Sequence, residues 1–575
     1  MMGKLTWVAL ILCVGICAFG VGEDRQYPYR WVYASSRLAD EADLERVKGV
    51  VQTAADHGLN GILLSCGADR LDMQSDEYLG RLLDLKSFAQ ERGVEIIPSI
   101  FSTGYGGSLL AHNRNLAAGL PVKDALLVAK GDKAEFHADS PEGLKNGSFE
   151  QHDGAKVIHF EYEATKGGSI QVDEETIKEG KASLRFEVTG DRSVERSERG
   201  LSVSQVFAVK PHRTYRVSAW VKSEGMDPSR PFGSGNLRIK SYAAEDDHQL
   251  DWININAPAS GDWFKVHLGF NSLGYDTVRI SLGSSGESVG KFWIDDLQVA
   301  EVGLVNVLRR PGTPVTIRSE TGGTEYEEGR DYEPVSDPEL NFRWNRESRA
   351  VKLVAGGRIK PNERLRISYY HGTHVYNGQT PVCMSEPQVY EIWRKNARLM
   401  QEKVGFKSFF FHMDEIRAGG TCAACKARNL PMKEIFGDCV TRAHNIIREV
   451  APDAEIFIWS DMLDPNHNAS TRRPYYFHVP ETFDGSWEFV PRDLVIACWN
   501  FRIRDKSLKH FSDLGHRTIA AAYYDADDLE NPRGWLEALS RTPDASGIMY
   551  TTWLRKYDLL ADFGDLVSKA RKSGH

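Results

Sequence analysis

Two adjacent acids follow a run of large apolar residues in the C-terminal half of the chain. The pattern at 407–413 predicts a buried strand that ends at Asp414 and Glu415. Neighbouring strand residues point to opposite faces, so both carboxyls reach one site only where the strand stops and turns. The glycine-containing segment 417–420 favours such a stop. Two carboxyls at one site can perform acid/base work at a glycosidic oxygen, whereas the alternative interpretation is an exposed turn with two acids.

Aromatic and acidic residues also stand at the ends of the strands predicted further along the chain. These strand patterns lie at 455–460, 494–499, 517–523 and 547–553. Aromatic faces stack on the apolar faces of sugar rings, although any single tryptophan can equally be a core residue. Three tryptophans at strand ends beside acids are harder to explain as core packing alone. The predicted substrate-binding residues are His412, Trp459, Asp461, Trp499, Tyr523, Tyr524, Asp525 and Trp553.

The elements that must position these residues are alternating strands and helices. Before residue 142, strand patterns at 30–34, 61–65 and 94–100 alternate with amphipathic helix patterns at 40–57 and 76–92. With the five later strands they make a parallel (β/α)8 TIM barrel, whose active site forms at the carboxyl ends of its strands. We therefore predict the α/β class, with the barrel interrupted after its third strand.

The interruption consists of β modules. Period-two alternation without helical patterns at 142–302 predicts an antiparallel β-sandwich, and 303–370 predicts a second small β unit. The barrel then comprises 23–141 and 371–575, with the catalytic residues in the second part.

The strand that ends at the acid pair resembles a known motif. Residues 411–415 resemble the His-x-Gly-Gly-Asp-Glu run of family 20 glycoside hydrolases, the β-N-acetylhexosaminidases, with His412 and Met413 in place of the two glycines. The segment 383–390 and the order of the later aromatic residues are also similar to that family.

This resemblance implies a substrate-assisted retaining mechanism. Glu415 would be the general acid/base, and Asp414 would orient the 2-acetamido group that attacks the anomeric carbon. Tyr524, or Tyr523, would hydrogen-bond the acetamido oxygen, and Asp525 would contact the sugar or a residue that binds it. The tryptophans would wall the pocket, and catalysis would need no cofactor.

The predicted sandwich resembles galactose-binding-like carbohydrate-binding modules through its opening residues 146–150 and closing residues 293–297. Such modules often hold a structural calcium ion, here near Glu150 and Asp296. A weak sugar-binding module linked to a catalytic barrel raises the local substrate concentration. Because it is inserted, the sandwich could instead form a rigid wall of the cleft.

The first 22 residues predict a secretory signal peptide. An early positive charge precedes an apolar run at 7–19 and small residues at 18 and 20. We expect a secreted or periplasmic protein, with no other segment apolar enough to cross a bilayer. A net charge of −9 argues against a nucleic-acid partner; the expected partner is an oligosaccharide or polysaccharide.

Six cysteines remain after removal of the signal peptide, too few for a disulfide scaffold in a chain of this length. Cys422 and Cys425 form a Cys-x-x-Cys pair, and Cys439 follows. A loop disulfide or free thiols would explain them. Zinc is the alternative, with no fourth ligand evident nearby.

Three classes of function fit these observations. The leading hypothesis is a secreted glycoside hydrolase that cleaves terminal β-linked N-acetylhexosamine or a related hexose. A divergent polysaccharide hydrolase would keep Glu415 as acid and use Asp461 or Asp525 as nucleophile or base. That enzyme is a variant of the first class. The second class is a catalytically silent glycan-binding protein, and the third is a metal-assisted hydrolase that uses His412, Asp414 and the Cys-x-x-Cys pair.

Overall fold

The computed structural model describes residues 25–572 except 142, 155, 165, 190–199, 228–236, 285–288, 377 and 471–477. The predicted signal peptide, 1–22, lies outside the described residues.

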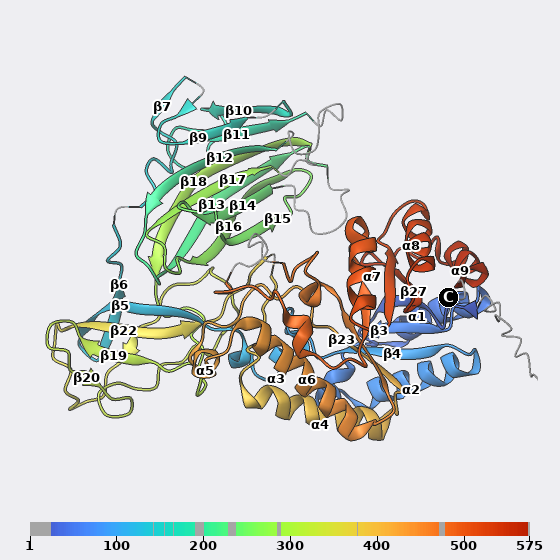
Figure 1. Cartoon of the computed structure of the whole chain (residues 1–575). Coiled ribbons are helices and arrows are strands. Elements are labelled where there is room, and N and C mark those ends of the chain that lie inside the picture. Colours follow the sequence, from blue (N-terminus) through green and yellow to red (C-terminus); the bar gives the residue numbers. More distant parts are fainter. Residues whose placement is uncertain are drawn as a thin grey trace, which may run out of the picture.

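Eight parallel strands close into a barrel, which confirms the predicted fold class (Figure 1). Three strands precede the inserted β modules and five follow them, and their order around the wall is β2-β27-β26-β25-β24-β23-β4-β3. The strands are β2 (Tyr29–Ser35), β3 (Gly61–Ser65), β4 (Glu95–Ile100), β23 (Ser408–Phe411), β24 (Glu455–Trp459), β25 (Val495–Cys498), β26 (Thr518–Tyr523) and β27 (Ala545–Thr551).

Period-two alternation divides each barrel strand between two apolar cores. In β24, Phe457 and Trp459 belong to the cluster that fills the barrel interior. Ile456 and Ile458 belong to the cluster between the strands and the helices. Because both faces are covered, the strands are mainly apolar, as expected for a buried parallel sheet.

Helices cover the outside of the barrel. Asp40 caps α1, its side chain accepting a hydrogen bond from the Asp43 amide, and Gly58 follows the helix with a φ of 78°. The helices are α1 (Glu41–Asp56), α2 (Asp76–Glu91), α3 (Gly107–His112), α4 (Pro387–Lys403), α5 (Ala423–Ala427), α6 (Met432–Val450), α7 (Arg504–Asp513), α8 (Glu530–Ser540) and α9 (Leu560–Lys569). Among the described helices, none has both the length and the apolar character that a membrane crossing needs.

The insert between β4 and β23 contains a sandwich of two five-stranded antiparallel sheets. One sheet is formed by β10 (Gly168–Asp173), β11 (Ser183–Val188), β18 (Gly290–Val302), β13 (Thr214–Glu224) and β16 (Gly261–Asn271). The other is formed by β15 (Gln249–Ile255), β14 (Leu237–Ala243), β17 (Thr277–Ser284), β12 (Leu201–Ala208) and β9 (Glu161–Ala164). Both sheets contribute alternate residues to one core, for example Leu201 and Val203 of β12.

A six-stranded sheet lies between the sandwich and the barrel in the chain. Its strands are β20 (Glu325–Tyr326), β19 (Thr316–Ser319), β22 (Arg364–His371), β5 (Leu120–Lys130), β6 (Lys133–His137) and β21 (Val351–Lys352). Strands β5 and β6 precede the sandwich, in the segment 23–141 that the sequence assigns to the barrel. Their antiparallel pairing with each other and with β22 places residues 120–137 in this sheet instead. Two short ladders join β1 (Arg25–Gln26) to β28 (Arg571–Lys572) and β7 (His152–Asp153) to β8 (Lys156–Val157).

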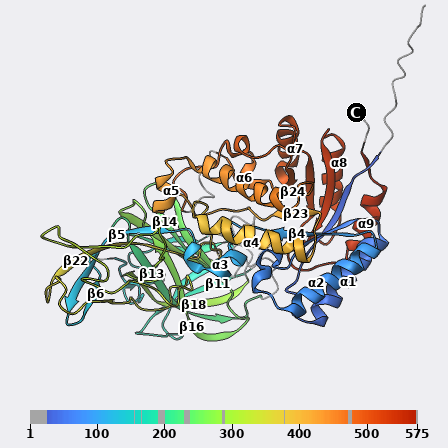
Figure 2. The same cartoon turned by 90° about the horizontal axis from the view of Figure 1, so that it is seen from below.

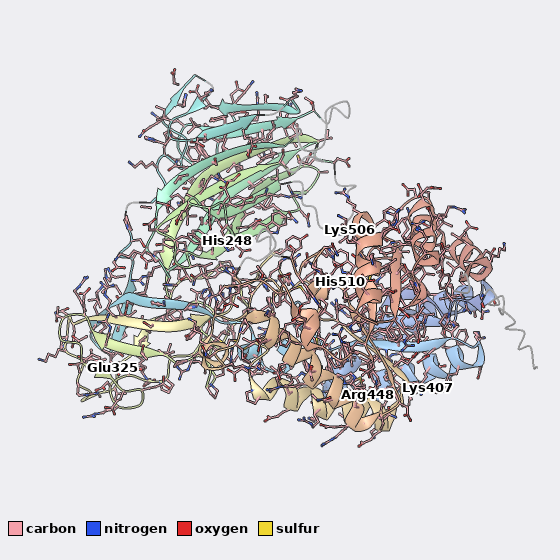
Figure 3. The ribbon with its side chains drawn as sticks, in the orientation of Figure 1. His248, Glu325, Lys407, Arg448, Lys506 and His510 are labelled. Atoms are coloured by element: carbon pink, nitrogen blue, oxygen red, sulfur yellow. The ribbon has the colours of Figure 1, made fainter. Side chains whose placement is uncertain are left out.

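The insert lies to one side of the barrel. Figures 1 and 2 both show the six-stranded sheet on the side of the molecule opposite α1 and α9. Lys407 and Arg448 mark the amino ends of β23 and β24, and they lie at the edge of the barrel remote from the sandwich (Figure 3). The carboxyl ends of these strands are therefore the ends available for contact with inserted segments.

Candidate functional site

The acid pair occupies the turn that ends β23. The strand stops at Phe411, and Glu415 adopts a left-handed backbone with a φ of 52°. The Glu415 amide donates a hydrogen bond of 2.9 Å to Oδ2 of Asp461, which follows β24. This turn removes the strict alternation of a strand, so both Asp414 and Glu415 reach the carboxyl end of the barrel, where catalytic residues of this fold lie.

Asp414 is a buried acid among other acids. The residue is 8% exposed, and burial raises its pKa well above the usual range, with further increases from the charges of Asp461 and Glu415. Nε2 of His412 lies 3.2 Å from Oδ1 of Asp414, but the contact lacks hydrogen-bond geometry and Oδ1 has no hydrogen-bond partner. Burial lowers the pKa of His412 to about 4, so its imidazole is neutral at pH 7. Oδ1 of Asp414 is thus a buried acceptor without a hydrogen-bond partner.

Glu415 is held by residues that the sequence pattern does not single out. Its Oε2 accepts a hydrogen bond from the Tyr105 hydroxyl, and its Oε1 lies 3.1 Å from Nη2 of Arg417. Gln379 donates a hydrogen bond to the Glu415 carbonyl oxygen and accepts one from Arg417. These groups come from the loop after β4, the loop after β22 and the turn itself, and together they fix the Glu415 carboxylate.

Asp461 supports the turn and is inaccessible to substrate. It is fully buried, and its Oδ2 accepts hydrogen bonds from the Glu415 amide and, at 2.8 Å, from Nδ2 of Asn468. Oδ1 accepts a longer bond of 3.4 Å from Nε1 of Trp499, whose ring packs edge-on against His467. Burial raises the Asp461 pKa. Asp461 thus positions Glu415 and Trp499.

Aromatic rings form one wall of the site. Trp553 lies 4.9 Å from Tyr33, 6.4 Å from Trp459 and 6.5 Å from Tyr524, measured between ring centroids. Trp553 and Tyr524 are 37% and 44% exposed, whereas Trp459 is 3% exposed and fills the barrel interior. Burial of the Tyr524 hydroxyl raises its pKa to about 12, with added contributions from Glu415 and Tyr376. Trp553 and Tyr524 are therefore the accessible rings beside the acids.

Two of the predicted binding residues have other roles. Tyr523 has a φ of 81°, and its ring belongs to the outer core, stacked on Tyr550 with centroids 4.0 Å apart. The predicted alternation would have placed it inside the barrel, but this backbone conformation directs it outward. Asp525 accepts hydrogen bonds from Thr552, from the Trp553 amide and from the Leu554 amide. It orders the loop that presents Trp553.

The sandwich contacts the site through one aromatic pair. Trp252 of β15 stacks on Tyr376, with ring centroids 5.0 Å apart, and the Tyr376 amide donates a 3.4 Å hydrogen bond to Asp251. The Arg417 guanidinium lies over the Tyr376 ring, 3.9 Å from its centroid. The inserted sandwich thereby supports the arginine that pairs with Glu415.

The two residues proposed for calcium lie on different segments of the sandwich, Glu150 before β7 and Asp296 in β18. Glu150 accepts hydrogen bonds from the Lys181 and Ala182 amides. Asp295, rather than its neighbour Asp296, accepts bonds from amides of the same turn at 178–179. Asp296 bonds to Gln298. The calcium site stays a prediction.

The six described cysteines are free thiols, and the Cys-x-x-Cys pair lies beside Cys383 rather than beside Cys439. Cys439 lies in α6, whereas Cys383, which precedes α4, lies against Cys422 and Cys425. Cys383 is 39 residues from Cys422 in the chain. The local spacing of cysteines therefore could not reveal this neighbour.

Only Gly104 gives a sequence signal for the Tyr105 contact. A Cβ on Gly104 would lie 2.0 Å from the Asp414 carbonyl oxygen, so the loop after β4 passes directly beneath the acid pair. A glycine-rich run containing Tyr105 at the end of the third predicted strand is consistent with such an approach.

No family model matches the chain, and no curated protein matches it. A rhamnosidase from Novosphingobium sp. PP1Y is 9% identical over 94% of this chain and 59% of its own, with a TM-score of 0.32. A chitobiase from Flavobacterium johnsoniae is 7% identical over 95% of this chain and 48% of its own, with a TM-score of 0.35. A xylan-binding domain from Paenibacillus barcinonensis is 15% identical over 29% of this chain and 97% of its own, with a TM-score of 0.20. The chain thus spans less than two thirds of either enzyme, and likenesses with such low TM-scores carry no argument about its activity.

The electrostatics of Asp414 predict an effect on stability. Its raised pKa means that the folded state binds a proton that the unfolded state releases above the usual aspartate pKa of about 4. The contribution of Asp414 to the free energy of unfolding therefore falls as the pH rises from about 4 through the raised pKa of the folded state. Asp414→Asn removes the ionisation, and we expect the variant to be more stable than the wild type near pH 7, by about 1–3 kcal/mol.

Thermal melts of both proteins between pH 4 and pH 8 measure this difference, with roughly equal stabilities expected at the acid end. Asp558→Asn, at an exposed acid in the loop before α9, is the matched control. A variant that is less stable than the wild type at pH 7 would contradict the account.

Proposed function

We propose that the chain is a secreted glycoside hydrolase that cleaves terminal β-linked N-acetylhexosamine, or a related hexose, from an oligosaccharide or polysaccharide. One observation carries the proposal. Asp414 and Glu415, with side chains 12% and 19% exposed, lie together at the carboxyl end of the barrel beside the accessible rings of Trp553 and Tyr524. Carboxyls beside exposed aromatic faces suit a sugar ring whose glycosidic bond is to be cleaved.

The two acids have different parts in the reaction. Glu415 donates its proton to the glycosidic oxygen as the bond to the anomeric carbon breaks. The carbonyl oxygen of the substrate's acetamido group forms the new bond to that carbon, and the Asp414 carboxyl group accepts a hydrogen bond from the acetamido N–H. Positive charge develops on the acetamido nitrogen; this charge lowers the pKa of Asp414 in the complex, and the ionised Asp414 then stabilises the charge strongly because the site is buried. Water, deprotonated by Glu415, then opens the cyclic intermediate and restores the acid.

The neighbouring groups support this division. The Tyr524 hydroxyl is placed to hydrogen-bond the acetamido oxygen, and Trp553 supplies a face for the ring. The burial of Asp461 and the three hydrogen bonds accepted by Asp525 favour the substrate-assisted mechanism over the two-carboxylate alternative. Asp461 is fully buried, and both carboxylate oxygens of Asp525 already accept hydrogen bonds.

The remaining parts of the proposal rest on the sequence and on one contact of the sandwich. The signal peptide pattern supports export to the periplasm or the exterior. The contact of Trp252 with Tyr376 supports the sandwich as part of the cleft wall, and a calcium ion near Glu150 would serve only its structure.

Replacing Glu415 should abolish turnover. Glu415→Gln keeps the shape and removes the ionisable proton, so we expect kcat on the best substrate to fall by about 10²–10⁴-fold or more. Aryl N-acetyl-β-glucosaminide, aryl N-acetyl-β-galactosaminide and the corresponding plain hexosides form the test panel, with release of the aryl group as the measurement.

Glu325→Gln, at an exposed glutamate of β20 far from the barrel mouth, is the matched control (Figure 3). Unchanged turnover in Glu415→Gln would remove this residue from the mechanism. Absence of turnover by the wild type on every glycoside, with retained sugar binding, would favour the silent glycan-binding alternative.

Arg417 should set the pH range of activity as a positioning residue. Its guanidinium stabilises the Glu415 carboxylate, so Arg417→Met should let Glu415 keep its proton to higher pH. We expect the alkaline limb of the kcat/KM profile to move upward by about one pH unit. Arg541→Met, at a half-exposed arginine that pairs with Asp505, is the control. A loss of activity with an unshifted profile would show that Arg417 acts only on structure.

A further inference from the structure

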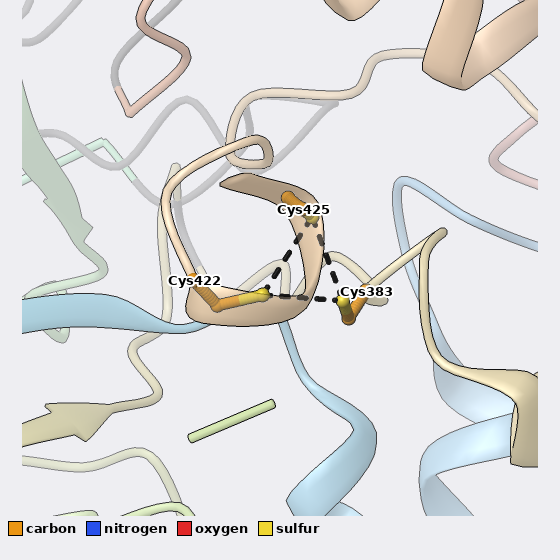
Figure 4. A group of neighbouring side chains, drawn as sticks. All are labelled: Cys383, Cys422 and Cys425. Carbon is orange, nitrogen blue, oxygen red and sulfur yellow. Dashed lines mark hydrogen bonds between the residues drawn. The ribbon is translucent and has the colours of Figure 1, made fainter. Parts of the chain in front are cut away.

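Three buried cysteines meet outside the proposed catalytic site. The side chains of Cys383, Cys422 and Cys425 are enclosed, with residue exposures of 1%, 1% and 4%. Their sulfurs form a nearly regular triangle with sides of 3.5, 3.7 and 3.6 Å (Figure 4). Among the described residues, this is the one group of three or more histidines, cysteines and acids that lie close enough together to share an ion.

The triangle has the dimensions of one face of a zinc–thiolate tetrahedron. With Zn–S bonds of about 2.3 Å, tetrahedral coordination separates the sulfurs by roughly 3.8 Å. A disulfide would need two of the sulfurs to approach to about 2.05 Å and would leave the third thiol over. We propose that Cys383, Cys422 and Cys425 bind one structural zinc ion.

The backbone holds the three thiols in place before any ion arrives. Cys422 caps the short helix α5, and Cys425 lies one turn further on, so the Cys-x-x-Cys spacing directs both sulfurs to one side. The Cys383 amide donates a 2.9 Å hydrogen bond to the Leu116 carbonyl oxygen. The Thr421 hydroxyl donates a 2.5 Å hydrogen bond to the Gly119 carbonyl oxygen. The ligands therefore need little rearrangement to bind.

A buried arginine balances the charge of such a site. Three thiolates around Zn²⁺ leave one net negative charge. The Arg310 side chain is 3% exposed, and its Nη2 has no hydrogen-bond partner, although its Nε pairs with Glu386 at 2.8 Å. The guanidinium lies close enough to Cys383 and Cys422 for its charge to act on their sulfurs. An unpartnered cationic N–H group beside the sulfurs is the neighbour expected for a thiolate-rich metal site.

The fourth tetrahedral position is left for an oxygen ligand. The Ser385 hydroxyl is buried within reach of the Cys425 sulfur, which makes it the candidate on this chain. With this position filled from within, the site is closed, as structural zinc sites are.

The place of the site in the fold indicates what the ion would stabilise. Cys422 ends the segment that begins at Arg417, and Cys383 follows the segment that carries Gln379. Zinc would therefore join two loops that hold Glu415, and it would link them to the segment 116–119 that leads into β5. The inference does not depend on the reaction proposed for those loops.

Metal analysis of the purified full chain tests the proposal. After dialysis against metal-free buffer, elemental mass spectrometry should find about one zinc per wild-type chain. Cys439→Ser, at a buried cysteine of α6 away from the cluster, should keep that content. Cys422→Ser and Cys383→Ser should retain less than roughly a tenth of it.

A second measurement covers variants that fail to fold. Wild-type protein stripped of metal should take up one equivalent of cobalt(II) with the near-ultraviolet absorption of thiolate–cobalt charge transfer, and zinc should displace it. Alkylation of the denatured protein should then find all three thiols reduced. A disulfide between two of the cysteines, or three thiols that take up neither zinc nor cobalt, would overturn the proposal.

Discussion

The hydrogen bond from the Glu415 amide to the Asp461 carboxylate is the constraint on which the site depends. It fixes the turn after β23, and this turn brings two sequence neighbours, Asp414 and Glu415, to the same end of the barrel. This arrangement has an electrostatic cost, because the hydrogen bond places a third acid, Asp461, beside Asp414 and Glu415. Burial and mutual repulsion then raise the pKa values of Asp414 and Asp461. Strain of this kind, in φ and in charge, is common where a fold holds reactive groups ready.

The inserted modules compensate for part of that cost. The fold places Arg417 over Tyr376, and Tyr376 is held by Trp252 and Asp251 of the sandwich. A guanidinium brought to Glu415 in this way offsets the clustered negative charge. The sandwich, separated from the barrel in sequence, is thus coupled physically to the acid pair. Zinc at the cysteine triangle would hold the loop that carries Arg417 at its other end, through Cys422. It would also hold the loop that carries Gln379, through Cys383.

The sequence predicts the barrel well because strand periodicity is local and both faces of each strand are apolar. It also predicts that Asp414 and Glu415 stand at a strand end, since a run of phenylalanines stops there. It fails where backbone conformation or long-range contact decides the outcome. A positive φ sends Tyr523 into the outer core, and the spacing of Cys422 and Cys425 does not reveal Cys383. Tyr105, Gln379 and Arg417 meet Glu415 only after three loops converge, so no pattern along the chain identifies them.

The stereochemistry of the first product is the most direct measurement of how the acid pair works. Proton magnetic resonance during hydrolysis of an N-acetyl-β-hexosaminide distinguishes the two anomers before they equilibrate. Attack by the acetamido oxygen followed by water inverts the anomeric carbon twice, so the account predicts that the β anomer appears first. Initial release of the α anomer would contradict it, because a single displacement needs a second accessible carboxylate to activate water.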